Sequence, residues 1–267
     1  MKELSIDEIR GLQLEILSIV HNLCIEEGLK YSLAGGTMLG AVRHNGYIPW
    51  DDDIDIMMRR RDYIKLLDII ESSHSKLQVH AIDRSGEQFF PCIYSKLAIK
   101  NTTVIETNNA PYLKNIGVNI DVFPLDEAGN STWSKLYKFT VVRQVIRVIA
   151  VMSFPNEDKS FFKQLLVNIL KPFNNVIISI FQKIYKRLVT TEKEKKKPNT
   201  VSFGSVYGSR DVFDSSIYNE YQCYAFEGHE FMGIKNSDVY LSTLYGNYMS
   251  LPPEKDRINH GTRAFVQ

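Results

Sequence analysis

Hydrophobic residues recur along the first part of the chain with the spacing of an amphipathic helix. Residues 5–8 read Ser-Ile-Asp-Glu, the form of a capping box, which marks a helix start. An apolar stripe then runs toward Gly28, and its members are Ile9, Leu12, Ile16, Val20, Leu23 and Cys24. This pattern predicts one helix whose apolar face packs on a core. His21 lies within it, and we interpret His21 as a surface or packed residue.

Shorter apolar runs predict strands elsewhere. We expect them at residues 31–33, 53–57, 78–82, 94–99, 104–106 and 115–123, with a helix over 62–70 on Tyr63, Leu66, Leu67 and Ile70. The chain thus combines helices with strands.

The section from residue 133 to 198 differs from the rest in charge. Its part from Lys135 to Lys197 contains 14 Lys or Arg against 4 Asp or Glu, although the whole chain has a formal net charge of only +1. Two amphipathic segments follow each other here. Arg143 and Arg147 interrupt the first, and several lysines interrupt the second, so we expect neither to form a transmembrane span. Basic amphipathic helices fit the surface of an anionic membrane. An ordinary helical subdomain with solvated lysines is the alternative.

We therefore divide the chain into three parts. Residues 1–132 form a core, residues 133–198 a basic helical insertion that ends in a linker at 193–198, and residues 199–267 complete the domain that the core begins. A chain of 267 residues with 44% hydrophobic residues is ample for a buried core.

Cysteine usage and the N-terminus bear on the compartment. Cys24, Cys92 and Cys223 are far apart and form no Cys-x-x-Cys pair, which favours neither a disulfide framework nor a structural zinc site. The first residues lack the apolar run of a signal peptide. We expect a cytoplasmic protein at the inner face of the cell membrane, in which the Asn-x-Thr matches at Asn101 and Asn130 carry no glycan.

A small-residue turn stands at the centre of the chain. After the strand at 31–33, Gly35 and Gly36 break the pattern, and Thr37 is a candidate N-cap for a helix. Free N–H groups at such a helix start face an anion, and glycines let the backbone approach a phosphate closely. A plain strand-turn-helix connection is the alternative.

Four aspartates follow this turn within the sequence Trp-Asp-Asp-Asp-Ile-Asp-Ile. On a strand over 53–57, Asp53 and Asp55 project from one face, ~7 Å apart, while the two isoleucines enter the core. Two such carboxylates suit Mg²⁺ or Mn²⁺. Asp51 is expected to have a supporting, substrate-side role at most, and Asp52 to point away.

Other readings of the acidic run fit less well. An acidic surface loop does not explain why Ile54 and Ile56 alternate with aspartate. An EF-hand loop needs glycine at the position of Ile56 and glutamate at the position of Asp62. An Asp-x-Asp glycosyltransferase site remains open, because a metal there also holds a nucleotide diphosphate.

Together these motifs resemble the LicD family of phosphocholine transferases. The resemblance rests on the run from Gly35 to Asp55, on Ile-Asp-Val-Phe-Pro-Leu-Asp at 120–126, and on Leu-x-x-x-Tyr-Gly-Asn-Tyr-Met-x-Leu-Pro-Pro at 241–253. It covers about residues 5–126 and 200–262, and the middle third matches only loosely. The family is similar in turn to the fukutin-type phosphotransferases and to the nucleotidyltransferase fold. This similarity implies an α+β protein in which additional helices surround a small mixed sheet.

The resemblance implies a third carboxylate on a later strand, and Asp121 fits that place. Ile120 and Val122 have the opposite parity, so they can face the core while Asp121 faces the site. Arg43 and His44 end the helix that begins at the glycine turn. Arginine can neutralise phosphate oxygens, although a cation at a helix C-terminus also has a purely structural explanation.

The implied reaction moves phosphocholine from CDP-choline to a sugar hydroxyl of a lipid-linked cell-surface glycan or teichoic acid precursor. Mg²⁺ on Asp53 and Asp55 would clamp the diphosphate, and Asp121 would bind metal and help to take the proton of the hydroxyl. The partners are thus a nucleotide donor and a glycan, with no nucleic acid. Glycerol phosphate or ribitol phosphate would use the same metal site, and an inactive scaffold is a further alternative, opposed by the three intact aspartates.

Aromatic residues are frequent in the C-terminal part, and rings between Tyr218 and Tyr248 are the expected source of a choline site, since a quaternary ammonium favours ring faces. Arg257 and His260 are brought toward the site by the family resemblance, without assigned roles.

Overall fold

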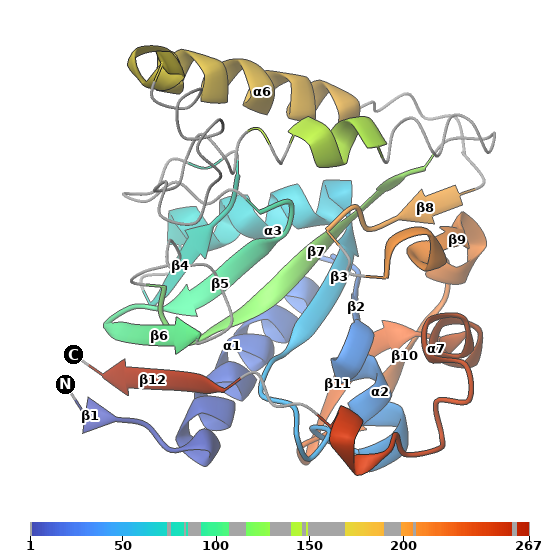
Figure 1. Ribbon diagram of the computed structural model, residues 1–267. Coiled ribbons are helices and arrows are strands. Elements are labelled where there is room, and N and C mark those ends of the chain that lie inside the picture. Colours follow the sequence, from blue (N-terminus) through green and yellow to red (C-terminus); the bar gives the residue numbers. More distant parts are fainter. Residues whose placement is uncertain are drawn as a thin grey trace.

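A mixed seven-stranded sheet organises the fold (Figure 1). The computed structural model describes residues 2–73, 76–82, 84, 92–106, 116–128, 140–145, 148, 169–189, 199–204, 207–257 and 261–266. The main strand order is β2 (Tyr31–Leu33), β3 (Asp55–Arg59), β7 (Asn119–Glu127), β5 (Ser95–Ile99) and β4 (Leu77–His80). β8 (Asn199–Val201) pairs with the far end of β7, and β9 (Val212–Asp214) pairs with β8. The α+β class is confirmed, with a larger sheet than the sequence indicated.

The pairing of β3 with β7 decides the position of the site. These two strands are parallel, and Asp55 stands opposite Asp121 in their register. Because side chains alternate along a strand, Ile56, Ile120 and Val122 are buried in the core, as the sequence predicted. The aspartates lie on the other face of the sheet.

Two helices cover the core face. α1 (Ile6–Glu26) contacts β5 and β7, and α3 (Arg60–Ser73) contacts β3, β4 and β7. The predicted capping box of α1 is present: the Ser5 hydroxyl accepts from the Glu8 N–H, and the Glu8 carboxylate accepts from the Ser5 N–H. Both predicted helices are confirmed, and the apolar spacing of each explains which face is buried.

The site face is bordered by elements from both ends of the chain. α2 (Gly35–His44) contacts β3 and α7 (Ser237–Tyr245), and it also contacts the hairpin of β10 (Tyr221–Phe226) and β11 (His229–Ile234). Glu227 and Gly228 join the hairpin strands with φ of 50° and 76°, the left-handed conformation that a two-residue hairpin turn needs. The hairpin is fixed to β2, because the Met232 and Ile234 N–H groups donate to Tyr31 Oη and Ser32 Oγ.

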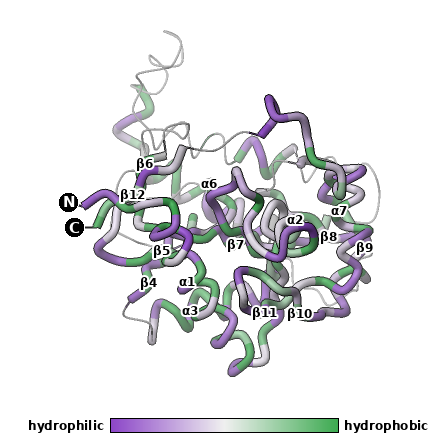
Figure 2. The backbone as a smooth tube through the Cα atoms, turned by 90° about the horizontal axis from the view of Figure 1, so that it is seen from below, coloured by the Kyte–Doolittle hydropathy of each residue, from purple (hydrophilic) through white to green (hydrophobic). Residues whose placement is uncertain are grey.

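A second sheet joins the chain ends. β1 (Lys2–Glu3), β12 (Thr262–Val266) and β6 (Thr102–Glu106) form it, all antiparallel. Figures 1 and 2 both place the N- and C-termini side by side. Short 3₁₀ turns complete the described elements, at Lys171–Phe173, Gly208–Asp211, Ser215–Tyr218 and Glu254–Asp256.

The basic section contributes α6 (Asn174–Val189), which packs on a second, smaller core. Tyr185 is buried there and accepts a hydrogen bond from Arg60, whose guanidinium also makes a bidentate ion pair with the buried Asp126. Asp126 of the family motif therefore has a structural contact. No helix in the described ranges is both long and apolar enough to cross a bilayer.

Several boundaries differ from the prediction. β3 begins at Asp55, so Asp53 precedes the strand, and β7 continues to Glu127, beyond the expected end at 123. The strand carboxylates nevertheless keep the predicted parity. The domain boundaries at 132/133 and 198/199, the linker at 193–198 and His260 involve residues outside the described part of the chain.

Candidate active site

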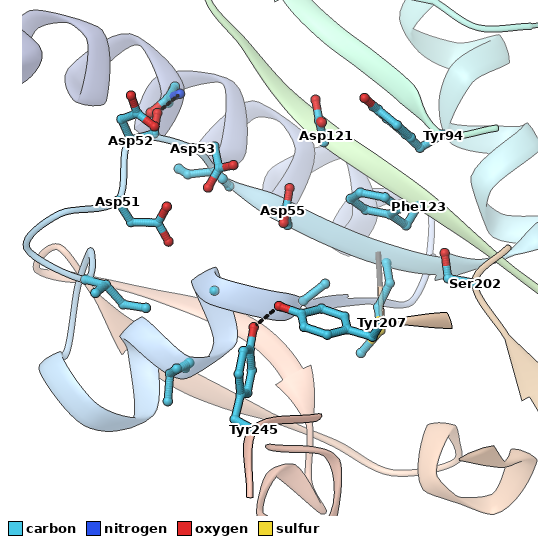
Figure 3. Close-up of a pocket in the computed structure, with 18 of the residues that line it drawn as sticks. Asp51, Asp52, Asp53, Asp55, Tyr94, Asp121, Phe123, Ser202, Tyr207 and Tyr245 are labelled. Atoms are coloured by element: carbon cyan, nitrogen blue, oxygen red, sulfur yellow. Dashed lines mark hydrogen bonds between the residues drawn. The ribbon is translucent and has the colours of Figure 1, made fainter. Parts of the chain in front are cut away.

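A cavity of about 860 Å³ opens where the ends of β3 and β7 meet α2 and α7. Its lining includes every aspartate that the sequence singled out: Asp51, Asp53, Asp55 and Asp121. Figure 3 shows Asp51, Asp53 and Asp55 following one another along the approach to β3, with Asp121 on the neighbouring strand β7. These four carboxylates therefore border the same cavity, and their joint role in one site stays a prediction.

Asp55 lies in an unfavourable electrostatic environment. Burial raises its pKa well above the usual 3.8, and the carboxylates of Asp53, Asp121 and Asp51 raise it further, while Lys96 acts in the opposite direction. Like charges in a desolvated site disfavour ionisation. A cation in the cavity would relieve this repulsion.

Lys96 is the one lysine that lines the cavity, among the residues the structure describes, and the sequence prediction missed it. Its ammonium group lies 2.7 Å from Asp121 Oδ1 and 3.0 Å from Asn119 Oδ1, and the residue is only 5% exposed. Lys96 stands on β5 directly opposite Asp121. The available signal was a single lysine in the otherwise apolar strand Ser-Lys-Leu-Ala-Ile.

The glycine turn starts α2, but not as predicted. Ala34 occupies the N-cap position, and Gly35 with φ of 49° is the first helical residue. Thr37 is therefore inside the first turn, and its hydroxyl accepts a hydrogen bond from the Asp55 N–H at 2.8 Å. The N-cap assignment was wrong, and Thr37 instead connects the start of α2 to β3.

The first turn of α2 faces the aspartates. A Cβ at Gly35 would lie 3.3 Å from Asp55 Oδ2, and a Cβ at Gly36 only 2.6 Å from Asp51 Oδ2. The backbone N–H groups at a helix start have no partner within the helix, so they are available to an anion. The Gly35 N–H already donates a hydrogen bond to Tyr240 Oη. Absence of side chains at these glycines keeps the carboxylates and the helix start within reach of one ligand.

Asp51 and Asp52 have different surroundings. Asp51 lies over Gly36 in the cavity, and its expected substrate-side role stays a prediction. Asp52 also borders the cavity but is only 2% exposed, and its carboxylate accepts from the Thr262 N–H, which connects the acidic run to β12. The expectation that Asp52 points away likewise stays a prediction.

Arg43 and His44 lie at the far end of α2. The Arg43 guanidinium donates to the carbonyl oxygens of Tyr248 and Ser250 and to His44 Nε2, so it holds the 248–250 segment against α2. Burial lowers the pKa of both side chains, and the neighbouring Arg43 contributes to the shift of His44. Arg43 lines the cavity, whereas His44 is not among the lining residues.

Aromatic side chains form much of the remaining wall. Tyr207 and Tyr245 cross at 79° with their hydroxyl groups hydrogen-bonded, as the dashed line in Figure 3 marks. Opposite them, Tyr94 and Phe123 stack with ring centroids 4.9 Å apart. Of the aromatic residues within 218–248, only Tyr240, Tyr245 and Tyr248 line the cavity, while the buried rings of Tyr218, Phe226 and Phe231 belong to the core.

The donor set suits a hard divalent cation in its chemistry, because carboxylate oxygens are the ligands that Mg²⁺ prefers. The repulsion that raises the pKa of Asp55 is a further observation in favour. Within the described ranges, however, no three His, Cys, Asp or Glu side chains stand close enough to ligate one ion together. Convergence of Asp53, Asp55 and Asp121 on one metal thus stays a prediction. Arg257 lies outside the cavity lining, with its guanidinium over the Trp50 ring.

Known proteins match the same part of the chain. The family model described as the nucleotidyltransferase domain of LicD/FKTN/FKRP matches residues 28–158, which include the glycine turn and all four aspartates. The lipopolysaccharide cholinephosphotransferase LicD of Haemophilus influenzae is 27% identical over 97% of this chain and 97% of its own length.

Two uncharacterized proteins match shorter stretches. One from Rickettsia typhi is 30% identical over 49% of this chain and 48% of its own length, and one from Rickettsia prowazekii is 43% identical over 21% of each. The near full-length match and the family model agree with the motifs and with the cavity that those motifs surround. Residues 28–158 thus match the LicD family, and the near full-length match extends the similarity to the rest of the chain.

Proposed function

We propose that this protein is a metal-dependent phosphotransferase that moves phosphocholine from CDP-choline to a sugar hydroxyl of a surface glycan. The observation that carries the proposal is the position of Asp55 opposite Asp121 on parallel strands, beside the glycine-rich start of α2. This arrangement combines clustered carboxylates with backbone N–H groups, which phosphoryl transfer needs together. The cholinephosphotransferase name of the Haemophilus influenzae relative supports the choline assignment.

Each part of the cavity has a role in the proposal. Asp53 and Asp55 would hold Mg²⁺ or Mn²⁺, which supplies charge neutralisation for a diphosphate. The first turn of α2, at Gly35, Gly36 and Thr37, would bind phosphate oxygens. Arg43 keeps the 248–250 segment in place at the cavity wall.

The proposed reaction forms one bond to phosphorus and breaks another. The acceptor oxygen forms a bond to the phosphorus that carries choline, the bond from that phosphorus to the bridging oxygen breaks, and CMP leaves. Asp121 would take the proton of the acceptor hydroxyl. Lys96, which is ion-paired to Asp121, would offset the negative charge that collects beside the transferred group.

Two alternatives use the same cavity. Transfer of glycerol phosphate or ribitol phosphate would need polar side chains for the hydroxyl groups of the moved alcohol. An Asp-x-Asp glycosyltransferase would use the metal with a nucleotide sugar instead. The aromatic wall formed by Tyr94, Phe123 and Tyr207 favours choline over a polyol.

The test is a donor panel. Purified protein is incubated with Mg²⁺, a glycan acceptor and CDP-choline, CDP-glycerol, CDP-ribitol or a nucleotide sugar, and nucleotide release is measured. We expect CMP from CDP-choline, with none after chelation by EDTA. Release from a nucleotide sugar alone would overturn the proposed reaction class.

We also propose that α6 binds the anionic inner face of the cell membrane, near a lipid-linked acceptor. An apolar stripe on and next to α6 is exposed: Phe173, Val176, Ile180 and Ile184 are 36–60% exposed. Basic residues at 171, 183, 186 and 187 accompany this stripe. Apolar contact with lipid and electrostatic attraction to its head groups would act together.

A further inference from the structure

The cavity has two chemically different ends. The aspartates gather at one end, and beyond Asp55 Figure 3 shows Phe123 and Tyr207 on opposite sides, with Ser202 behind them. Phe123 follows Asp121 by two positions on β7, so both side chains lie on the site face of the sheet. Tyr207 approaches from the other side, where its hydroxyl lies 4.0 Å from an ideal Cβ at Gly35. The aromatic end is therefore adjacent to the phosphate-binding end.

This aromatic end is a built feature of the fold. The Phe123 ring is supported from behind by Tyr94, and Gly204 lies against both, since a Cβ there would be 3.4 Å from each ring. Tyr207 is held by its hydrogen bond to Tyr245. Burial raises the pKa of Tyr207 to about 12, so its phenol stays neutral near pH 7.

A buried carboxylate at this end of the cavity favours a cation. Asp211 is a cavity-lining carboxylate that is only 3% exposed and lies near enough to Tyr207 to act on its pKa. Ser202 Oγ is buried and makes no hydrogen bond among the residues that the structure describes. Two basic groups among the described residues already have partners here: Lys96 pairs with Asp121, and Arg210 donates to the Leu244 carbonyl and lies over the Tyr207 ring, 5.9 Å from its centroid.

From this arrangement we infer that Phe123 and Tyr207, with the carboxylate of Asp211, form the subsite for the trimethylammonium group of the transferred phosphocholine. The inference rests on the proposed function and names the part of the cavity that selects the head group. Ring faces attract a quaternary ammonium by their quadrupole, and a buried carboxylate adds charge attraction. The rings lie beside the aspartates, as a phosphocholine group requires when its phosphate is at the metal end. The sequence had located the choline site between Tyr218 and Tyr248, so the inferred residues differ from that expectation.

Calorimetry without acceptor tests the subsite apart from turnover. The ligands are CDP-choline, its neutral isostere with a 3,3-dimethylbutyl group, and CMP, each with Mg²⁺ present. We expect the wild type to bind CDP-choline about tenfold more tightly than the isostere, because only the former has the charge. Equal affinity for the two would overturn the inference.

Variants then locate the effect. Phe123→Leu keeps apolar volume but loses a ring face, and Tyr207→Leu does the same on the other side; both should lose most of the preference for CDP-choline over the isostere. Tyr207→Phe keeps the ring and should keep the preference. Phe265→Leu removes a ring on β12, outside the cavity, and is the matched control. Melting temperatures identify any variant that fails to fold. If one of the two ring variants does not fold, the binding preference of the other tests the subsite.

The outcomes separate the two levels of the proposal. If Phe123→Leu weakens the binding of CMP as much as the binding of CDP-choline, the ring contacts the cytosine base, and the subsite assignment is wrong. If both ring variants keep the preference for CDP-choline, the cation lies elsewhere, although the phosphotransferase proposal stands. If no CDP-alcohol binds or releases CMP, the proposed function itself fails.

Discussion

Lys96 Nζ lies 2.7 Å from Asp121 Oδ1, and this ion pair connects β5 to β7 at the wall of the active-site cavity. The ammonium group is nearly buried, and it is a positive charge within an acidic cluster. The pair has two consequences. It stabilises the folded chain before any cation binds, and it directs one oxygen of Asp121.

Lys96→Met should therefore destabilise the protein while keeping most of the side-chain volume. We expect a loss of about 1–3 kcal/mol in the free energy of unfolding, because the variant leaves the Asp121 carboxylate beside Asp55 without its partner. Urea denaturation measures it. The matched control is Lys235→Met, which removes a lysine paired with Glu220 on the exposed surface and should cost less than about 1 kcal/mol. If both variants lowered the free energy of unfolding equally, the buried ion pair would contribute no more to stability than the exposed one.

Asp55 makes the stability of the metal-free protein depend on pH. Its native pKa is raised above 3.8, so the folded state binds more protons than the unfolded state between 3.8 and that raised value. Stability should fall as pH rises through this window, and Asp55→Asn should remove the contribution and raise the melting temperature at pH 7. Mg²⁺ should stabilise the wild type at pH 7 and have little effect on Asp55→Asn. A melting temperature of Asp55→Asn that follows wild type at every pH would contradict this account.

Gly36→Ala tests the contact between the helix start and Asp51. A Cβ there would lie 2.6 Å from Asp51 Oδ2, so the carboxylate must move away. We expect kcat/KM to fall by at least about tenfold, because a small displacement of a binding group has a large effect on catalysis. Gly11→Ala is the control: Gly11 is exposed within α1, nothing lies within 4 Å of its Cβ position, and alanine should stabilise the helix by about 0.5–1 kcal/mol. Full activity of Gly36→Ala would remove Asp51 from the site.

The exposed stripe of α6 predicts salt-sensitive membrane binding. The protein should co-sediment with vesicles that contain anionic lipid at low salt, and less at higher salt, because screening weakens the electrostatic part. Replacing Phe173 and Ile180 by serine should abolish sedimentation without lowering activity on a soluble acceptor. Binding that is unchanged in this double variant would assign the contact to another surface.

The sequence predicted the face of the aspartates well, because strand parity is a local property. Ile54 and Ile56 had to enter the core, so Asp53 and Asp55 had to face the other way, and the same reasoning placed Asp121. The capping box of α1 was equally local. The parallel pairing of β3 with β7 brings Asp55 opposite Asp121, and neither strand alone predicts this pairing. The expectation that Asp121 joins the site came from the family resemblance.

The errors concern contacts between segments distant in sequence. Threonine is a common N-cap residue, yet the N-cap is Ala34, three residues earlier, and Gly35 with its positive φ is the first helical residue. The Thr37 hydroxyl therefore accepts a hydrogen bond from the Asp55 N–H instead. The role of Phe123 was hidden for a similar reason. Its position on the site face follows from parity, but only the fold brings Tyr207 to the other side of the cavity.

Turnover by Asp55→Ala tests the central claim most directly. CMP release from CDP-choline is measured with Mg²⁺ and acceptor, beside the melting temperature of the same preparation. We predict a loss of several orders of magnitude with the fold retained, because the variant removes a charged oxygen ligand from the centre of the carboxylate cluster. Retention of more than about a tenth of the wild-type rate, in a protein that melts normally, would contradict the claim that these aspartates perform metal-dependent phosphocholine transfer.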